Sequence, residues 1–180
     1  DKGPEALLDA SANMELYDIE TDSEVYLQGI YTAPAIYENS SPEAMVAASE
    51  KESLRYIDAG KFLVSIGGEH SVSIGPIQAH AKRYKNLSVL QIDAHTDLRD
   101  SYEGSKNNHA CVMARAQDLC PIVQVGIRSM DVGEKDRLDP NRVFWGHRVT
   151  QNDDWMDSAI DLLTDDVYLT IDLDGFDPSI

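Results

Sequence analysis

Residues 87–97 constrain this chain more than any other stretch, because a hydrophobic run there leads directly into three potential metal ligands. The stretch reads LSVLQIDAHTD and ends in Asp93, His95 and Asp97. Alternate residues of an extended chain point to one side, so this spacing directs the three side chains into one cavity. The C-terminal ends of strands are where α/β sheets place their chemistry. We therefore expect a buried strand that ends in a cation site.

Two further hydrophobic runs end in the same way. Residues 62–66 lead through two glycines to Glu69 and His70, and residues 167–171 lead to Asp172 and Asp174. The candidate metal ligands are His70, Asp93, His95, Asp97, Asp172 and Asp174. An isolated acidic pair could equally form a turn, but three such strand ends together are hard to explain as solvated surface. Carboxylates and imidazoles suit hard or borderline divalent ions, and two ions would make a shared water acidic enough to attack as hydroxide. This pattern predicts metal-assisted hydrolysis.

The order of the expected elements indicates an α/β fold. We expect helices over residues 3–13, 40–60, 71–84, 109–119 and 155–163, and strands over residues 62–66, 87–92, 122–128, 143–145 and 167–171. A short edge strand is expected at residues 25–27, and residues 98–108 are polar enough for an active-site loop. Alternating strands and helices predict three layers, with helices on both faces of a mainly parallel sheet.

The composition limits the possible partners. The chain has 180 residues, which suits one domain, and a formal charge of −17, which argues against binding to nucleic acid or an anionic membrane. A solvated acidic surface accounts for most of this charge, although it also suits a cationic ligand. Cys111 and Cys120 lack metal-type spacing and predict free thiols in a reducing, cytoplasmic compartment. Because the sequence stops soon after Asp174, we expect residues 1–180 to be one domain that is incomplete at both ends.

Three sequence blocks resemble the signatures of the ureohydrolase family of arginases and agmatinases. They are GGEHS at residues 67–71, DAHTD at residues 93–97 and IDLDGFDP at residues 171–178, in the order of the family. The resemblance implies an arginase-like fold, a homo-oligomer, two manganese ions per chain, and hydrolysis of a guanidino group to urea and an amine. It implies that His70 holds one ion and that His95 and Asp174 hold the other. Asp93, Asp97 and Asp172 would lie between the ions or bridge them.

Details of these blocks resemble agmatinases more than arginases. Glu69 stands where arginases usually have Asp, and no Asn follows Asp97 closely to hold a substrate carboxylate. The stretch HACVM at residues 109–113 also resembles the agmatinase loop. The resemblance therefore implies a small cationic guanidino substrate, agmatine, converted to urea and putrescine in polyamine biosynthesis. Asp97 would orient the metal-bridging hydroxide and His109 would protonate the departing amine, whereas position alone leaves His109 equally open to a solvent-facing role.

Several alternatives remain at this point. The substrate could be guanidinobutyrate, arginine or another guanidino compound, and the chain could be a metal-binding relative without turnover. An arginase-fold zinc deacetylase needs fewer ligands, so the additional His70, Asp97 and Asp172 argue against it. His80 lies inside an expected helix and is expected to be structural, and His147 follows a short strand with its role open. The glutamate that binds the guanidinium in the family has no counterpart in residues 1–180.

Overall fold

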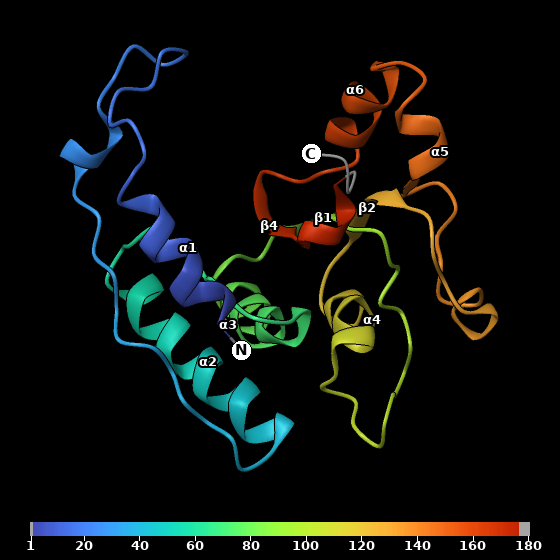
Figure 1. Cartoon of the computed structure of the whole chain (residues 1–180). Helices are drawn as coiled ribbons and strands as arrows, with labels where there is room; N and C mark the ends of the chain where they lie inside the picture. Colours follow the sequence, from blue (N-terminus) through green and yellow to red (C-terminus); the bar gives the residue numbers. More distant parts are fainter. Residues whose placement is uncertain (1, 177–180) are drawn as a thin grey trace.

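The computed structural model describes residues 2–176 and contains a parallel sheet with helices on both sides (Figure 1). Its α-helices are α1 (Gly3–Ser11), α2 (Pro42–Asp58), α3 (Ile74–Arg83), α4 (Val112–Gln117), α5 (Gly146–Val149) and α6 (Asp154–Asp161). Its strands are β1 (Leu87–Ile92), β2 (Ile122–Ile127), β3 (Val143–Trp145) and β4 (Asp166–Ile171). Short 3₁₀ helices cover Val25–Gln28, His70–Ser73, His109–Cys111, Val132–Glu134 and Leu173–Gly175.

The sheet has the strand order β3-β2-β1-β4, and every pairing in it is parallel. Parallel neighbours need crossover connections. The connection from β1 to β2 contains α4 and that from β3 to β4 contains α5 and α6, whereas the one from β2 to β3 contains only the 3₁₀ helix Val132–Glu134. Because all strands run in the same direction, their C-terminal ends meet at one edge. In the register, Ile92 at the end of β1 pairs with Ile171 at the end of β4, which sets the segments that follow both strands side by side.

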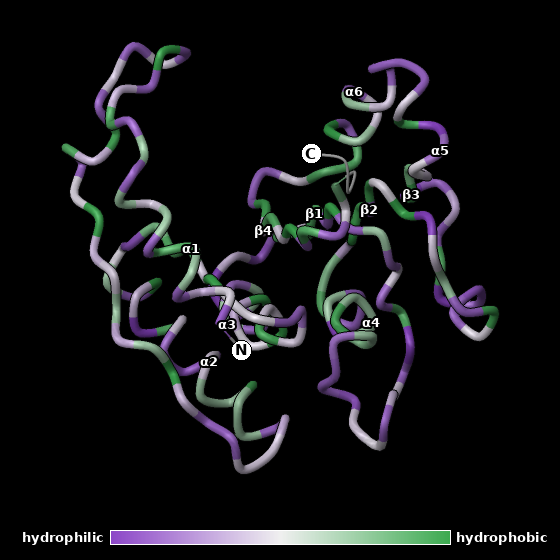
Figure 2. Tube along the Cα trace, viewed as in Figure 1, coloured by the Kyte–Doolittle hydropathy of each residue, from purple (hydrophilic) through white to green (hydrophobic). Residues whose placement is uncertain are grey.

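Two hydrophobic clusters fill the space on either side of the sheet. On one face Val89 packs with Ile77 of α3 and Met113 of α4, and all three side chains are buried. On the other face Val123 and Val125 pack with Ala159 of α6. Figure 2 shows apolar colouring along the strands of the sheet. These two clusters confirm the predicted three-layer α-β-α architecture.

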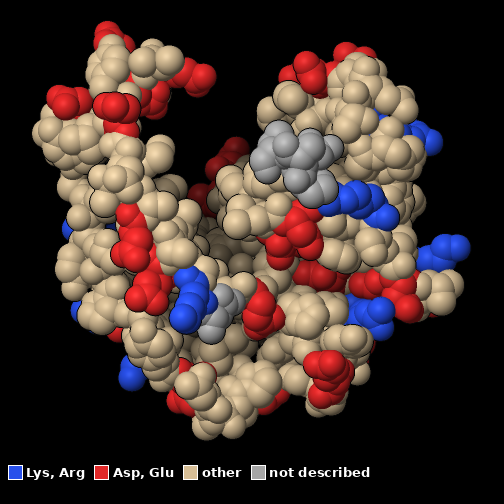
Figure 3. Space-filling view, viewed as in Figure 1, with Lys and Arg blue, Asp and Glu red and all other residues tan. Residues whose placement is uncertain are grey.

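The segment between α1 and α2, residues 12–41, contributes no buried side chain to the hydrophobic core. These residues form an irregular arm beside α1 and α2 (Figure 1). No Lys or Arg lies between Lys2 and Lys51, and Figure 3 shows acidic side chains gathered on this arm. In the part of the chain that the structure describes, no helix combines the length and the hydropathy needed to cross a membrane.

Two predicted strands are wrong. Residues 25–27 belong to the 3₁₀ helix Val25–Gln28, where the N–H groups of Leu27 and Gly29 donate to the carbonyls of Glu24 and Tyr26. These local bonds satisfy backbone groups that have no neighbouring strand to pair with. Residues 62–66 also lack regular structure, and a cleft of about 690 Å³ separates them from β4. Residues 62–66 pair with no strand in the described part of the chain, and Phe62 is 96% exposed.

The other predicted elements are confirmed with small shifts at their ends. The expected helices at residues 71–84 and 109–119 each begin with a 3₁₀ turn, at His70–Ser73 and His109–Cys111. His80 lies in α3, where its Nδ1 is 2.7 Å from the carbonyl oxygen of Pro76 and its ring packs against Tyr168. These contacts agree with the predicted structural role of His80. His147 is exposed in α5. Asp177 and Pro178, which end the third sequence block, lie outside the described residues.

Candidate metal centre

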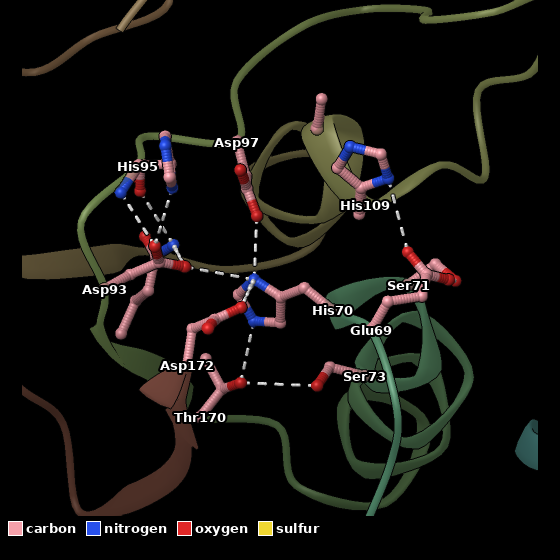
Figure 4. Close-up of polar contacts among 12 residues, drawn as sticks. Glu69, His70, Ser71, Ser73, Asp93, His95, Asp97, His109, Thr170 and Asp172 are labelled. Carbon is pink, nitrogen blue, oxygen red and sulfur yellow. Dashed lines mark hydrogen bonds and ion pairs between the residues drawn. The ribbon is translucent and has the colours of Figure 1, made fainter. Parts of the chain in front are cut away.

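The candidate ligands come together from three places at the C-terminal edge of the sheet (Figure 4). Asp93 follows β1 directly, and Asp172 follows β4 directly. His70 begins the 3₁₀ helix that precedes α3. Parallel strands that end in register place their following residues together, so the clustering of these side chains follows from the sheet topology.

The first group of ligands is buried. Nδ1 of His70 lies 2.7 Å from Oδ2 of Asp97 and 3.1 Å from Oδ2 of Asp93. It also lies 4.0 Å from Oδ2 of Asp172, which is half-buried. On the other side of the ring, Nε2 of His70 lies 2.9 Å from the hydroxyl of Thr170. The imidazole therefore directs Nδ1 at three carboxylates while Thr170 holds its opposite nitrogen.

The second group lies nearer the surface. Nδ1 of His95 lies 3.0 Å from Oδ2 of Asp174 and 3.7 Å from Oδ1 of Asp93. The backbone N–H of Ala94 donates to Oδ1 of Asp174 at 3.2 Å. Asp93 thus belongs to both groups, and ligand atoms within each group lie within 4.8 Å of one another. Of its two oxygens, Oδ2 faces His70 and Oδ1 faces His95.

The carboxylates of Asp93 and Asp97 in the buried group would be stabilised by a nearby positive charge. Burial alone would lower the pKa of His70, but hydrogen bonds and charge interactions with Asp93 and Asp97 outweigh it and raise this pKa to about 10. Burial raises the pKa of the Asp97 carboxyl, although His70 opposes this shift. The carboxylates therefore hold a proton on His70 in the absence of another positive charge. This surplus of negative charge, with carboxylate and imidazole donors only, fits a divalent metal ion.

The backbone around Asp97 is held in an unusual conformation. Asp97 has a φ of +52°, in the left-handed region that non-glycine residues seldom adopt. The N–H groups of Met113 and Ala114 both donate to its carbonyl oxygen, at 3.0 and 3.1 Å. The first turn of α4 thereby fixes the turn that carries the Asp97 side chain into the site.

Sequence reasoning missed Glu134, whose side chain accepts a hydrogen bond from the residue that follows Asp97. Its side chain is 4% exposed and accepts a hydrogen bond from the N–H of Leu98 at 2.8 Å and another from the N–H of Asp131 at 2.6 Å. Asp131 and Glu134 form a capping box. The D-x-x-E spacing was the available signal, but it indicates a helix start and not a contact with the residue after a ligand.

His109 lies at the rim of the site. It begins the 3₁₀ helix His109–Cys111, which contacts the 3₁₀ helix His70–Ser73. Its Nδ1 lies 3.4 Å from Oε2 of Glu69. Figure 4 marks this contact with a dashed line. The ring of His109 meets that of Tyr102 edge to face, with 5.8 Å between the ring centroids. The side chain is 53% exposed. This position leaves His109 accessible to a ligand that approaches the metal centre.

Comparison with known proteins supports the same family along the whole chain. The arginase family model matches residues 1–180. An N(1)-aminopropylagmatine ureohydrolase from Synechocystis sp. is 41% identical over 98% of this chain and 61% of its own length. An agmatinase from Pyrococcus horikoshii is 32% identical over 97% of this chain and 62% of its own length. The chain thus spans about three fifths of these relatives.

A solved structure gives the same result for the fold. The crystal structure of agmatine ureohydrolase from Thermoplasma volcanium superposes with a TM-score of 0.87 and 29% identity, covering 99% of this chain and 62% of that one. The resemblance therefore extends from the sequence blocks to the arrangement of helices and sheet that carries the ligand cluster. This chain belongs to the arginase family.

Proposed function

We propose that this chain forms the metal-binding part of a ureohydrolase that cleaves the guanidino group of agmatine into urea and putrescine. The observation that carries the proposal is the pair of ligand groups that share Asp93. One group contains His70, Asp93 and Asp97, and the other contains Asp93, His95 and Asp174. Asp172 belongs to neither group, but its Oδ2 lies 4.0 Å from Nδ1 of His70, and we propose it as a further ligand.

The ligand groups fit two divalent ions, for which we propose manganese. When bound, such ions would supply a nucleophile near neutral pH by lowering the pKa of water. The chain's own carboxylates would fix the position of that water, with Asp97 as the group that orients it. In the overall reaction, a bond would form from a water oxygen to the guanidinium carbon and the bond from this carbon to the alkylamine nitrogen would break, which gives urea and the amine once that nitrogen receives a proton.

The departing amine needs a proton, and His109 is the proposed donor. It lies at the rim of the cluster, is exposed to a substrate, and has Glu69 beside Nδ1. An imidazole in this place can transfer a proton during bond cleavage and regain one from water. The acidic surroundings also suit a substrate that carries a positive charge at each end.

A second candidate substrate is N1-aminopropylagmatine, which carries an additional amine. Three relatives that are 41%, 35% and 35% identical to this chain are named N(1)-aminopropylagmatine ureohydrolases. Two relatives named agmatinases are 32% identical to it. The ligand cluster would serve both substrates equally, because the two share the guanidino group and differ only in the tail.

Urea release from the full-length protein with manganese tests the proposal. Agmatine, N1-aminopropylagmatine, arginine and guanidinobutyrate are compared by kcat/KM, with Asp93→Asn as the control that damages both ligand groups. We expect the two polyamine-type substrates to exceed arginine and guanidinobutyrate, whose carboxylates meet an acidic site. Urea from none of the four would favour a metal-binding relative without turnover, and preference for arginine or guanidinobutyrate would refute the polyamine assignment.

A further inference from the structure

A row of polar residues crosses the sheet directly beneath the metal centre. Gln91 in β1 pairs in register with Gln124 in β2 on one side and with Thr170 in β4 on the other. All three lie within hydrophobic strands, and their exposed fractions are 0%, 1% and 5%. A buried polar group without partners is costly, so three of them in one row need an explanation.

The two glutamines form a chain of hydrogen bonds that ends on Asp93. Nε2 of Gln91 donates to Oδ2 of Asp93 at 2.7 Å and to the carbonyl oxygen of His95 at 3.1 Å. Nε2 of Gln124 donates to Oε1 of Gln91 at 2.6 Å and to the carbonyl oxygen of Thr96 at 2.8 Å. The network therefore joins the middle of the sheet to the loop that carries the ligands.

The partners fix the direction of every bond in this chain. A carboxylate and a backbone carbonyl can only accept hydrogen bonds. The amide N–H groups of Gln91 must therefore donate to Asp93 and to the carbonyl of His95, and those of Gln124 to Oε1 of Gln91 and the carbonyl of Thr96. Gln91 is left with Oε1 as an acceptor, and Gln124 supplies the donor that it needs. If the Gln91 amide were reversed, its oxygen would face the Asp93 carboxylate and its nitrogen would face the nitrogen of Gln124, and neither pair could form a hydrogen bond.

The same bonds fix the rotation of the Asp93 carboxylate. Oδ2 accepts from Gln91, and Oδ1 accepts from the backbone N–H of His95 at 2.7 Å. With both oxygens held, Oδ2 faces His70 and Oδ1 faces His95, so each oxygen serves a different ligand group. Because Gln91 is neutral, it stabilises the carboxylate without supplying a positive charge that would compete with a bound cation.

We propose that Gln91 and Gln124 are positioning residues that hold Asp93 in the orientation needed to bridge two divalent ions. Gln91 acts on Asp93 directly, and Gln124 acts through Gln91. This inference rests on the proposed function for the identity of the ions, but it concerns metal binding and needs no substrate for its test.

The test measures manganese binding to the full-length protein by calorimetry, and the coupling of bound manganese ions by electron paramagnetic resonance. Gln91→Met keeps the side-chain length and removes the donor to Asp93. We expect the affinity for manganese to fall by roughly 10- to 100-fold, the usual effect of losing a hydrogen-bond partner of a ligand. The spectrum of the coupled ion pair should change as well, which a general loss of stability would not cause.

Gln124→Met provides a second variant one step further from the ligand, should Gln91→Met not fold. Because Gln124 acts through Gln91, Gln124→Met should lower the manganese affinity less than Gln91→Met does. Adding Gln124→Met to Gln91→Met should lower the affinity little further. Val123→Ala, in the same strand but on the opposite face, is the matched control. It should lower stability and leave the affinity and the coupled spectrum unchanged.

Parent-like manganese affinity and coupling in folded Gln91→Met, or in folded Gln124→Met if the former does not fold, would overturn the inference. A parent protein that binds no coupled pair of manganese ions would overturn it together with the proposed function. A parent protein that binds the pair but releases no urea would refute the proposed function alone, and the variants would still decide the role of the two glutamines.

Discussion

Nδ1 of His70 lies 2.7 Å from Oδ2 of Asp97 in a buried site, where the nearby carboxylates hold the pKa of the imidazole at about 10 although burial alone would lower it. At neutral pH His70 of the metal-free protein is therefore in its charged imidazolium form, with a proton on both ring nitrogens. A metal ion that uses Nδ1 must displace the proton on that nitrogen, because an imidazole ligand binds in its neutral form.

We predict that manganese binding releases about one proton from His70 at neutral pH, and that affinity rises with pH until it levels off near pH 10. Calorimetry in two buffers with different ionisation enthalpies measures the released proton directly. His70→Ala serves as the control and should lose both the proton release and one of the two ions. A binding enthalpy that is the same in both buffers would contradict this prediction.

The contact between Thr170 and His70 gives a second prediction. The Thr170 hydroxyl lies 2.9 Å from Nε2 of His70, opposite the nitrogen that faces the carboxylates. Thr170→Val has nearly the same shape but cannot form this bond, so manganese affinity should fall by about 10- to 100-fold. Thr170→Ser keeps the hydroxyl and should bind manganese much as the parent protein does. Equal affinities for the two variants, measured by calorimetry, would show that the bond does not orient His70.

Close packing at Gly175 gives a third prediction. A Cβ atom there would lie 2.9 Å from the backbone nitrogen of Asp93 and 3.0 Å from its Cα, so Gly175→Ala must push the 3₁₀ helix Leu173–Gly175 away from the end of β1. We expect a loss of about 1–3 kcal/mol in the free energy of unfolding, as for other overpacked sites, together with weaker manganese binding as Asp172 and Asp174 shift. Denaturant titration and calorimetry measure the two effects.

Gly104→Ala is the matched control for Gly175→Ala. Gly104 has a φ of +84° and no atom within 4 Å of its added Cβ, so the variant bears the backbone strain without a clash near the ligands. It should reduce stability and leave manganese affinity unchanged. If both variants lost affinity alike, the effect would come from general destabilisation and not from the contact with Asp93.

Much of the fold could be predicted because burial and chemistry change abruptly at the strand ends. In β1 the apolar residues stop at Ile92 and the ligands begin at Asp93, so one pattern predicted both the strand and its site. The strand predicted at residues 62–66 failed because its apolar residues show only that the segment can be buried. Whether it joins a sheet depends on a neighbour at hydrogen-bonding distance, and a cleft lies there instead.

The supporting residues could not be predicted for a different reason. Gln91 and Gln124 lie 33 positions apart, each within a hydrophobic strand. In the linear sequence nothing indicates that these two polar residues are in contact. Only the register that pairs β1 with β2 shows that they are neighbours and that both serve Asp93. Glu134 is a similar case, because its spacing from Asp131 indicated a cap and gave no sign of its bond to Leu98.

His109 provides the prediction that separates binding from chemistry. Its Nδ1 lies 3.4 Å from Glu69, and it belongs to neither group of ligands in the described part of the chain. His109→Asn retains a polar side chain but cannot deliver a proton, so both manganese ions should stay bound while kcat for urea release falls by roughly 10²-fold or more. Calorimetry and steady-state kinetics on the same preparation check the two parts. A variant that binds manganese and turns over the substrate at the parent rate would show that the departing amine takes its proton from another group, and Asp97 would then be the next residue to test.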